Sequence, residues 1–148
     1  MEFSTKRFSE WQNQWHYPEK MDVFNYISFN IHPEEVLILS SLFFPKLIEV
    51  EGCIFLDSKY DYENYLLWKK EFNNDRTAME KMINHTHIYD IFSNCTDKIE
   101  DTIFEQVGQL LQSSWSNFFC KQFPEKTIIV EYSHTESDYG PILYVFQA

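Results

Sequence analysis

Two histidines that lie two residues apart have the types and the spacing best suited to chemistry in this chain. They belong to the segment from Asn84 to Asp90, Asn-His-Thr-His-Ile-Tyr-Asp. On a β-strand, side chains two positions apart project from the same face, which is how several metal sites offer a pair of imidazoles. His85 and His87 would form such a pair, with Asp90 as a candidate oxygen ligand and His134 as a further imidazole.

The same segment has a second interpretation, as an ordinary helix end or loop. If the preceding helix continues through it, the side chains of His85 and His87 point about 200° apart around the helix axis and cannot share a metal ion. The chain also contains no HExxH motif and no Cys/His spacing that would supply further ligands. We therefore expect no bound metal and no cofactor. A small metal-dependent enzyme that uses His85 and His87 is the alternative.

Other catalytic motifs are missing from the sequence. There is no GxSxG motif for a nucleophilic serine, and three glycines are too few for the usual phosphate-cradling loops. Carboxylates are plentiful, but no pair is singled out by its spacing. We expect no catalytic residues, and we predict that the protein is not an enzyme.

Tyrosine alternates with acidic residues in two segments, residues 60–65 (Tyr-Asp-Tyr-Glu-Asn-Tyr) and residues 136–139 (Glu-Ser-Asp-Tyr). Tyrosine offers a large contact area with a polar tip, and carboxylates steer and orient a basic partner. These segments supply the candidate partner contacts, which are Tyr60, Asp61, Glu63, Glu136, Asp138 and Tyr139.

Each segment also has a purely structural interpretation. Tyr62 and Tyr65 would belong to the core-facing stripe of a helix that Asp61 caps. In the second segment, Asp138 would stabilise a turn that precedes residues 140–141, Gly-Pro.

The charge of the chain limits its partners. The formal net charge is −11, yet 18% of the 148 residues are aromatic. We therefore expect a folded protein with an aromatic-rich core and with its acidic residues on the surface. Nucleic acid and anionic membrane surfaces are bound through Lys and Arg, and we expect neither as a ligand. A basic protein is the expected partner, with an acidic surface that serves only solubility as the alternative.

The composition favours a cytoplasmic protein. The first residues contain no apolar segment of a secretory signal, and no apolar run approaches the roughly 20 residues that span a bilayer. The three cysteines are odd in number and widely spaced, which favours reduced thiols over disulfides.

Hydrophobic periodicity predicts several helices. Residues 6–16 are amphipathic, and Pro33 begins a helix whose body is apolar nearly all round, so we expect it to be buried. In the last predicted helix, Asp97 as N-cap and Glu100 form a capping-box pattern. The remaining helices are expected over residues 61–72, 75–84 and 97–121.

Strands are expected where hydrophobicity alternates or β-formers cluster. Residues 47–51 alternate, Gly52 marks a turn before residues 53–56, and the runs 126–132 and 142–146 form a C-terminal hairpin. No linker or repeat marks a boundary, so we predict one domain over residues 1–148. The expected fold class is α+β, an antiparallel sheet that includes the C-terminal hairpin and packs against several helices.

The chain resembles small bacterial immunity proteins, the cytoplasmic antitoxins that are paired with polymorphic or contact-dependent inhibition toxins. The resemblance lies in the acidic α+β domain, in residues 84–90, and in residues 138–147 (Asp-Tyr-Gly-Pro-Ile-Leu-Tyr-Val-Phe-Gln), which are similar to the final hairpin of proteins assigned to that role. Membership would imply tight one-to-one binding that occludes the active site of a toxin domain, often a basic nuclease. It would also imply no cofactor and no catalysis.

From the charge and this resemblance we expect a protein that binds and neutralises a cognate, basic toxin domain. The alternatives are the metal-dependent enzyme described above and a homodimeric scaffold that buries its aromatic surplus between two copies.

Overall fold

Two compact units make up the chain, residues 1–40 and residues 41–148. The computed structural model describes residues 5–148, and each unit is described by itself. The first four residues, part of the segment in which we expect no secretory signal, lie outside the described residues. One domain over residues 1–148 remains a prediction.

Short helices form the first unit. Asp22 starts one of them with a capping box: its carboxylate accepts the Asn25 N–H, and the Asn25 side chain accepts the Asp22 N–H. The elements of this unit are α1 (Lys6–Gln12), the 3-10 turn η1 (Pro18–Lys20), α2 (Val23–Asn30) and most of α3 (Pro33–Phe43).

Aromatic rings hold α1 against α2. The ring of Trp11 contacts those of Tyr26 and Phe29, with centroid distances of 5.2 and 6.1 Å. No residue among residues 5–40 is fully buried, so this unit has aromatic contacts without an enclosed core.

The prediction that the apolar helix after Pro33 is buried is wrong. Its residues Val36 to Leu39 are all exposed, with Leu37 and Ile38 at 70% and 72%. Successive helical residues lie 100° apart, so four consecutive apolar residues point in all directions around the axis. Only neighbours on several sides would cover such a helix, and the described residues of the first unit supply none that do so.

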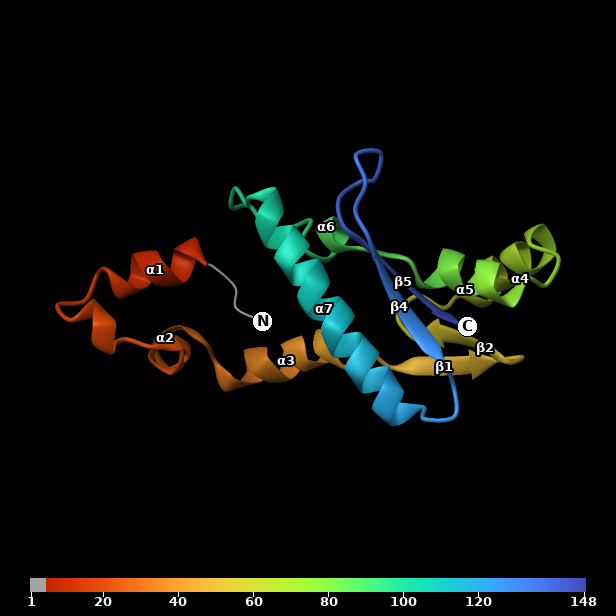
Figure 1. Ribbon diagram of the computed structural model, residues 1–148, viewed down its shortest axis with the longest axis horizontal. Coiled ribbons are helices and arrows are strands. Elements are labelled where there is room, and N and C mark those ends of the chain that lie inside the picture. Colours follow the sequence, from red (N-terminus) through yellow and green to blue (C-terminus); the bar gives the residue numbers. More distant parts are fainter. Residues whose placement is uncertain (1–4) are drawn as a thin grey trace. The chain divides into compact units, whose positions relative to one another are not determined.

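Two small antiparallel sheets lie in the second unit, which confirms the α+β class and the C-terminal hairpin (Figure 1). One sheet is the hairpin of β1 (Leu47–Val50) and β2 (Cys53–Leu56), whose turn has positive φ at Glu51 and Gly52. The other has the order β3-β5-β4. Its strands are β3 (Thr86–His87), β4 (Ile128–Ser133) and β5 (Ile142–Gln147).

Four helices accompany these sheets. Asp61 and Asp75 cap the first two, as their carboxylates accept the N–H groups of Asn64 and Ala78 at 2.9 and 3.0 Å. The helices are α4 (Tyr62–Glu71), α5 (Arg76–Asn84), α6 (Ile88–Ile91) and α7 (Asp101–Gln122).

The long helix α7 begins three residues later than its capping-box pattern predicts, so the prediction of Asp97 as N-cap is wrong. Glu100 occupies the N-cap position and makes no side-chain cap hydrogen bond. The first residue of α7 makes a tertiary contact: Asp101 Oδ1 accepts a hydrogen bond from the Tyr89 hydroxyl at 3.0 Å.

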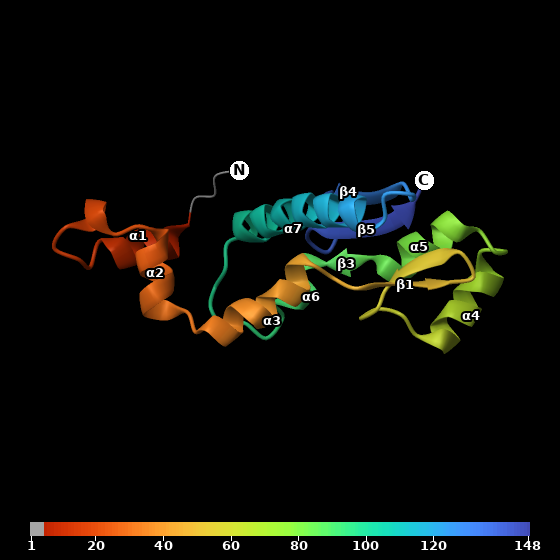
Figure 2. The same cartoon turned by 90° about the horizontal axis from the view of Figure 1, so that it is seen from below.

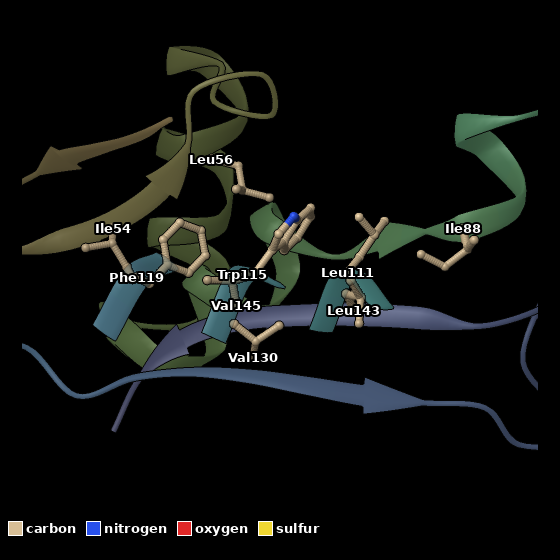
Figure 3. Packing of buried hydrophobic residues seen from close by; sticks show 9 residues of the cluster. All are labelled: Ile54, Leu56, Ile88, Leu111, Trp115, Phe119, Val130, Leu143 and Val145. Atoms are coloured by element: carbon tan, nitrogen blue, oxygen red, sulfur yellow. The ribbon is translucent and has the colours of Figure 1, made fainter. Parts of the chain in front are cut away.

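Side chains of α7, β2 and the three-stranded sheet form most of the main core. Figure 2 shows α7 running alongside β4 and β5. Trp115 is the largest member of the core and donates from Nε1 to the Leu42 carbonyl at 2.7 Å, near the end of α3. Gly108 lets α7 approach β4, since a Cβ there would lie 2.8 Å from the ring of Tyr132. Figure 3 shows the buried cluster, Ile54, Leu56, Ile88, Leu111, Trp115, Phe119, Val130, Leu143 and Val145.

A buried carboxylate joins the edges of the two sheets. Glu80 on α5 has no exposed surface. Its Oε1 accepts the Ile54 N–H of β2 at 2.8 Å, and its Oε2 accepts the Gln147 N–H of β5 at 2.7 Å. The Gln147 side-chain amide also donates to Oε1, at 2.7 Å. Glu80 therefore satisfies edge N–H groups that no strand pairs.

Asn84, one helical turn further along α5, continues this junction. Its Oδ1 accepts the Leu56 N–H at 2.8 Å, and its Nδ2 donates to the carbonyls of Ile54 and Val145, both at 2.9 Å. Four helical residues rise about 6 Å, close to the 6.4–6.8 Å that two strand residues span. Because one helical turn of α5 matches two residues of a strand in length, Glu80 and Asn84 can bond to successive backbone groups of β2 and β5. They take the place of a strand between these two edges.

Candidate binding surface

His85 is the C-cap of α5 and the short strand β3 covers Thr86–His87, so the segment is a helix end followed by a strand, and the continued helix is wrong. His85 has φ −58° and ψ 136°, and His87 has φ −75° and ψ 124°. Their rings lie side by side with centroids 5.3 Å apart and planes perpendicular. His134 is elsewhere, with its Nδ1 3.5 Å from a carboxylate oxygen of Glu105.

Both rings are oriented by backbone carbonyls. His85 Nδ1 lies 2.5 Å from the Met82 carbonyl oxygen, and His87 Nδ1 lies 3.3 Å from that of Tyr139. A carbonyl only accepts, so each Nδ1 carries the proton. Within residues 5–148, no three His, Cys, Asp or Glu side chains gather closely enough to enclose a metal ion.

The loop between β4 and β5 presents Tyr139, whose side chain is 64% exposed. Its ring contacts that of Tyr89 at 5.4 Å and that of His87 at 5.9 Å. The Tyr89 hydroxyl donates to Asp101, and this bond raises the pKa of Tyr89 above its usual value. Two of the predicted segments, residues 84–90 and 136–139, therefore meet in the structure.

Asp138 in this loop acts as a turn residue. Its Oδ2 accepts the Thr135 N–H at 2.8 Å and the Ser133 hydroxyl at 3.1 Å. The backbone hydrogen bond from Thr135 is the main reason that the pKa of Asp138 lies below its usual value. Glu136 remains exposed beside it. The carboxylate of Asp138 thus shapes the loop, and its contact with a partner remains a prediction.

Replacing Gly140 by Ala will destabilise the protein and displace Tyr89. Gly140 has φ +68°, and an added Cβ would lie 2.6 Å from the Tyr89 ring. We expect a loss of about 1–3 kcal/mol of unfolding free energy, measured by urea titration. Gly52→Ala is the matched control: its φ is +80°, but nothing lies within 4 Å of the added Cβ. Equal losses in both variants would show that backbone strain alone acts and that the Tyr89 contact contributes nothing.

Carboxylates dominate the surface around this loop, which we call the acidic end. It comprises α6, the connection from α6 to α7, the start of α7 and the β4–β5 loop, which Figure 1 shows close together. Lys98 is the single Lys or Arg in residues 82–120, and residues 127–148 contain none. The carboxylates of the acidic end are Asp90, Asp97, Glu100, Asp101, Glu105, Glu136 and Asp138.

Lysine side chains pair with carboxylates in other parts of the second unit. Lys126 pairs with Glu49 of β1 at 3.1 Å, and Lys69 pairs with Glu51 of the β1–β2 turn. Lys81 of α5 pairs with Glu131 at 3.0 Å. The positive charge is therefore concentrated away from the acidic end.

The first tyrosine segment is largely structural. Tyr65 is buried and donates its hydroxyl to Glu51 at 2.8 Å, and burial is the main cause of the raised pKa of Tyr65. Tyr60 stacks on Phe55, with ring centroids 5.5 Å apart. Asp61 caps α4 as expected and is exposed, like Glu63. The placement of Tyr62 in a core-facing stripe is wrong, since that side chain is 61% exposed.

A pocket of about 260 Å³ lies between residues next to the first tyrosine segment, residues 60–65, and residues of the histidine segment, residues 84–90. Its lining includes Ser58 and Lys59, which precede Tyr60, together with His87 and Asp90. Trp115 and Leu42 form part of its apolar wall. The volume is below the 300–1,000 Å³ of typical small-molecule sites, so it suits a single protein side chain better than a cofactor.

The cysteines form no reactive centre with these residues. Cys53 is buried, and desolvation is the main cause of the raised pKa of its thiol. Cys95 and Cys120 are exposed. All three are free thiols in the structure.

Sequence reasoning missed Glu80, Asn84 and Tyr89 as organising residues. Glu80 and Asn84 carried no signal, since a polar pair four residues apart on a helix is ordinarily solvent-facing. Tyr89 lies inside the segment from Asn84 to Asp90, and its proximity to Gly140 is a tertiary contact.

Comparison with protein-family models, curated proteins and solved structures gave no match to this chain. No helix of residues 5–148 is long and apolar enough to cross a membrane.

Proposed function

We propose that the protein is an immunity protein that binds and neutralises a cognate, basic toxin domain through the acidic end. The observation that carries this proposal is the exposed Tyr139 among seven carboxylates in regions with a single lysine. Exposed tyrosines are frequent anchors of protein interfaces, and a surface of one sign accelerates association with a partner of the opposite sign.

The charge distribution supports the same partner class. Residues 41–148 hold 17 of the 23 acidic residues and nine of the 12 basic ones, a net charge of −8. Because most lysines lie elsewhere, the local field at the acidic end exceeds what this average suggests. A basic partner that covers this region would neutralise charges that repel one another in the free protein.

Replacing Tyr139 by Ala will weaken the complex with the toxin about tenfold or more. The toxin candidate is the product of the neighbouring gene, and the measurements are its affinity by calorimetry and the survival of cells that express it. Tyr62→Ala is a matched variant, because Tyr62 has nearly the same exposure, 61% against 64%. Weakening by Tyr62→Ala alone would place the contact in residues 60–65 instead.

A charge-matched pair of variants tests steering by the acidic end. We expect Glu100→Gln with Glu136→Gln to lower the association rate and its salt dependence. Glu71→Gln with Glu125→Gln removes the same charge elsewhere and should leave both unchanged. If the wild-type chain neither binds the toxin candidate nor protects cells, this pairing is wrong.

The homodimeric scaffold remains a second candidate because of the apolar surface of the first unit. Phe24 is 75% exposed, and Leu37 and Ile38 of α3 are exposed nearly as much. Exposed apolar patches of this kind often mark association surfaces. Light scattering at micromolar concentration distinguishes the two: a dimer that Phe24→Ser dissociates favours the scaffold, and a monomer removes it.

A further inference from the structure

We propose that His85 and His87 bind one divalent transition-metal ion of the Cu²⁺, Ni²⁺ and Zn²⁺ class through their Nε2 atoms. The site is independent of the toxin-binding proposal. It would be a surface site with two protein ligands, since no third His, Cys, Asp or Glu of residues 5–148 completes it. Water would fill the remaining coordination positions.

The separation of the two rings fits chelation of one ion. Imidazoles that ligate a tetrahedral ion at about 2.0–2.1 Å place their ring centres roughly 5 Å apart. The centroids of His85 and His87 are 5.3 Å apart. The perpendicular ring planes do not oppose chelation, because an ion constrains the direction of each nitrogen lone pair and not the angle between the planes.

The tautomers of both rings leave the correct nitrogen available. Each Nδ1 donates its proton to a backbone carbonyl, that of Met82 for His85 and that of Tyr139 for His87. In the neutral ring, Nε2 then carries a lone pair and no proton. An Nδ1–H bonded to a carbonyl is also the usual outer contact of a metal-ligating histidine, because it fixes the orientation of the ring.

The backbone holds the pair in place before any ion binds. Asn84 and Thr86, which alternate with the histidines, are both buried. Asn84 bonds to β2 and β5, and Thr86 pairs with Leu143 of β5. His85, the C-cap of α5, and His87 of β3 are therefore attached to backbone whose buried neighbours are hydrogen-bonded, which lowers the conformational entropy lost on chelation.

The surrounding charges also favour a cation. The Asp90 carboxylate lines the pocket that His87 borders, and the seven carboxylates of the acidic end include it. Lys59 is the single Lys or Arg that lines this pocket. Nitrogen ligands with an adjacent carboxylate suit borderline ions, and the affinity order for divalent ions predicts Cu²⁺ as the tightest.

Titration of the full chain with CuCl₂, NiCl₂ and ZnCl₂ in a non-coordinating buffer tests the site. We expect one ion per chain, with Cu²⁺ bound most tightly and binding lost in acid as protons compete for Nε2. His85→Gln and His87→Gln should each weaken binding by at least about tenfold, since loss of an outer contact alone typically costs 10- to 100-fold. Cu²⁺ should selectively broaden the ring proton resonances of these two histidines.

His134→Gln is the matched control, because His134 is also partly exposed and lies beside the Glu105 carboxylate. Its affinity for the three ions should equal that of the wild type. Circular dichroism melting curves show whether each variant is folded. The proposal is wrong if the wild type shows no saturable one-to-one binding, if the double variant of His85 and His87 retains it, or if His134→Gln weakens it equally.

Discussion

Replacing Glu80 by Ala will lower the free energy of unfolding by about 3–5 kcal/mol. The change removes the acceptor of two buried backbone N–H groups, those of Ile54 and Gln147, and of the Gln147 side-chain amide. A buried donor left without a partner costs about 1–3 kcal/mol. Since small domains are stable by only about 5–15 kcal/mol, such a loss is a large share of the total. Urea titration followed by circular dichroism measures it.

Glu80→Gln separates shape from charge at the same position. Its amide nitrogen is a donor and would face an N–H group where the carboxylate oxygen now accepts. We expect a loss of about 1–3 kcal/mol, less than for Ala. Glu71→Gln, on the exposed C-terminal end of α4, should change stability by less than about 0.5 kcal/mol. A Glu80→Ala loss below about 1 kcal/mol would contradict the joining of the sheets by this side chain.

Replacing Asn84 by Asp will destabilise the protein by about 3–5 kcal/mol at neutral pH, although the side chains have the same shape. The amide nitrogen of Asn84 donates to the carbonyls of Ile54 and Val145. A carboxylate oxygen in its place would oppose two carbonyl oxygens in a buried site, with no cation to offset it. Asn117→Asp on an exposed face of α7 is the control and should have little effect.

The loss of unfolding free energy that Asn84→Asp causes, which we call its deficit, should become smaller in acid. The direction follows from the difference in proton binding between the folded and unfolded states. Burial disfavours the ionised form, so the pKa of the introduced carboxyl is raised in the folded state above its unfolded value of about 3.9. The unfolded state then binds fewer protons above this pH, and stability falls as pH rises until the folded pKa is reached. Measured against the wild type at each pH, the deficit should be smallest below about pH 4. A deficit that does not change with pH would show that the lost hydrogen bonds, and not a buried charge, cause it.

These substitutions also bear on the binding surface. His85 follows Asn84 directly and caps the end of α5, so the junction of the sheets positions the histidine pair and, through His87, the loop that carries Tyr139. If Asn84→Asp moves β3 away from β5, contacts of Tyr139 with the rings of His87 and Tyr89 should loosen as well. Chemical shifts of these rings report that displacement.

Local patterns predicted most of the helices and strands correctly. Asp61 and Asp75 cap α4 and α5 where a carboxylate precedes the helical pattern, and Gly52 turns the β1–β2 hairpin. The C-terminal hairpin was also expected. Caps, turns and side-chain periodicity act between residues a few positions apart, so the sequence alone carries them.

Tertiary contacts decided what these patterns left open. Exposure of Tyr62 and of residues 36–39 depends on which neighbours cover a helix, and periodicity does not supply that information. The start of α7 at Asp101 accompanies the hydrogen bond from Tyr89. Glu80 is buried because β2 and β5 both place an edge N–H group against the same side of α5, and this arrangement is tertiary.

For the candidate surface, the sequence determined which residues could bind a partner or an ion: the acidic residues, Tyr139, and the two histidines His85 and His87. The tertiary structure decided which of them meet. Tyr139 lies against His87 and Tyr89, although about 50 residues separate them along the chain, because β3 pairs with β5. Tyr60 and Tyr65 instead pack around Phe55. Residue type sets the chemistry that a side chain can perform, but only the pairing of distant strands sets its neighbours, because that pairing depends on the packing of the whole unit.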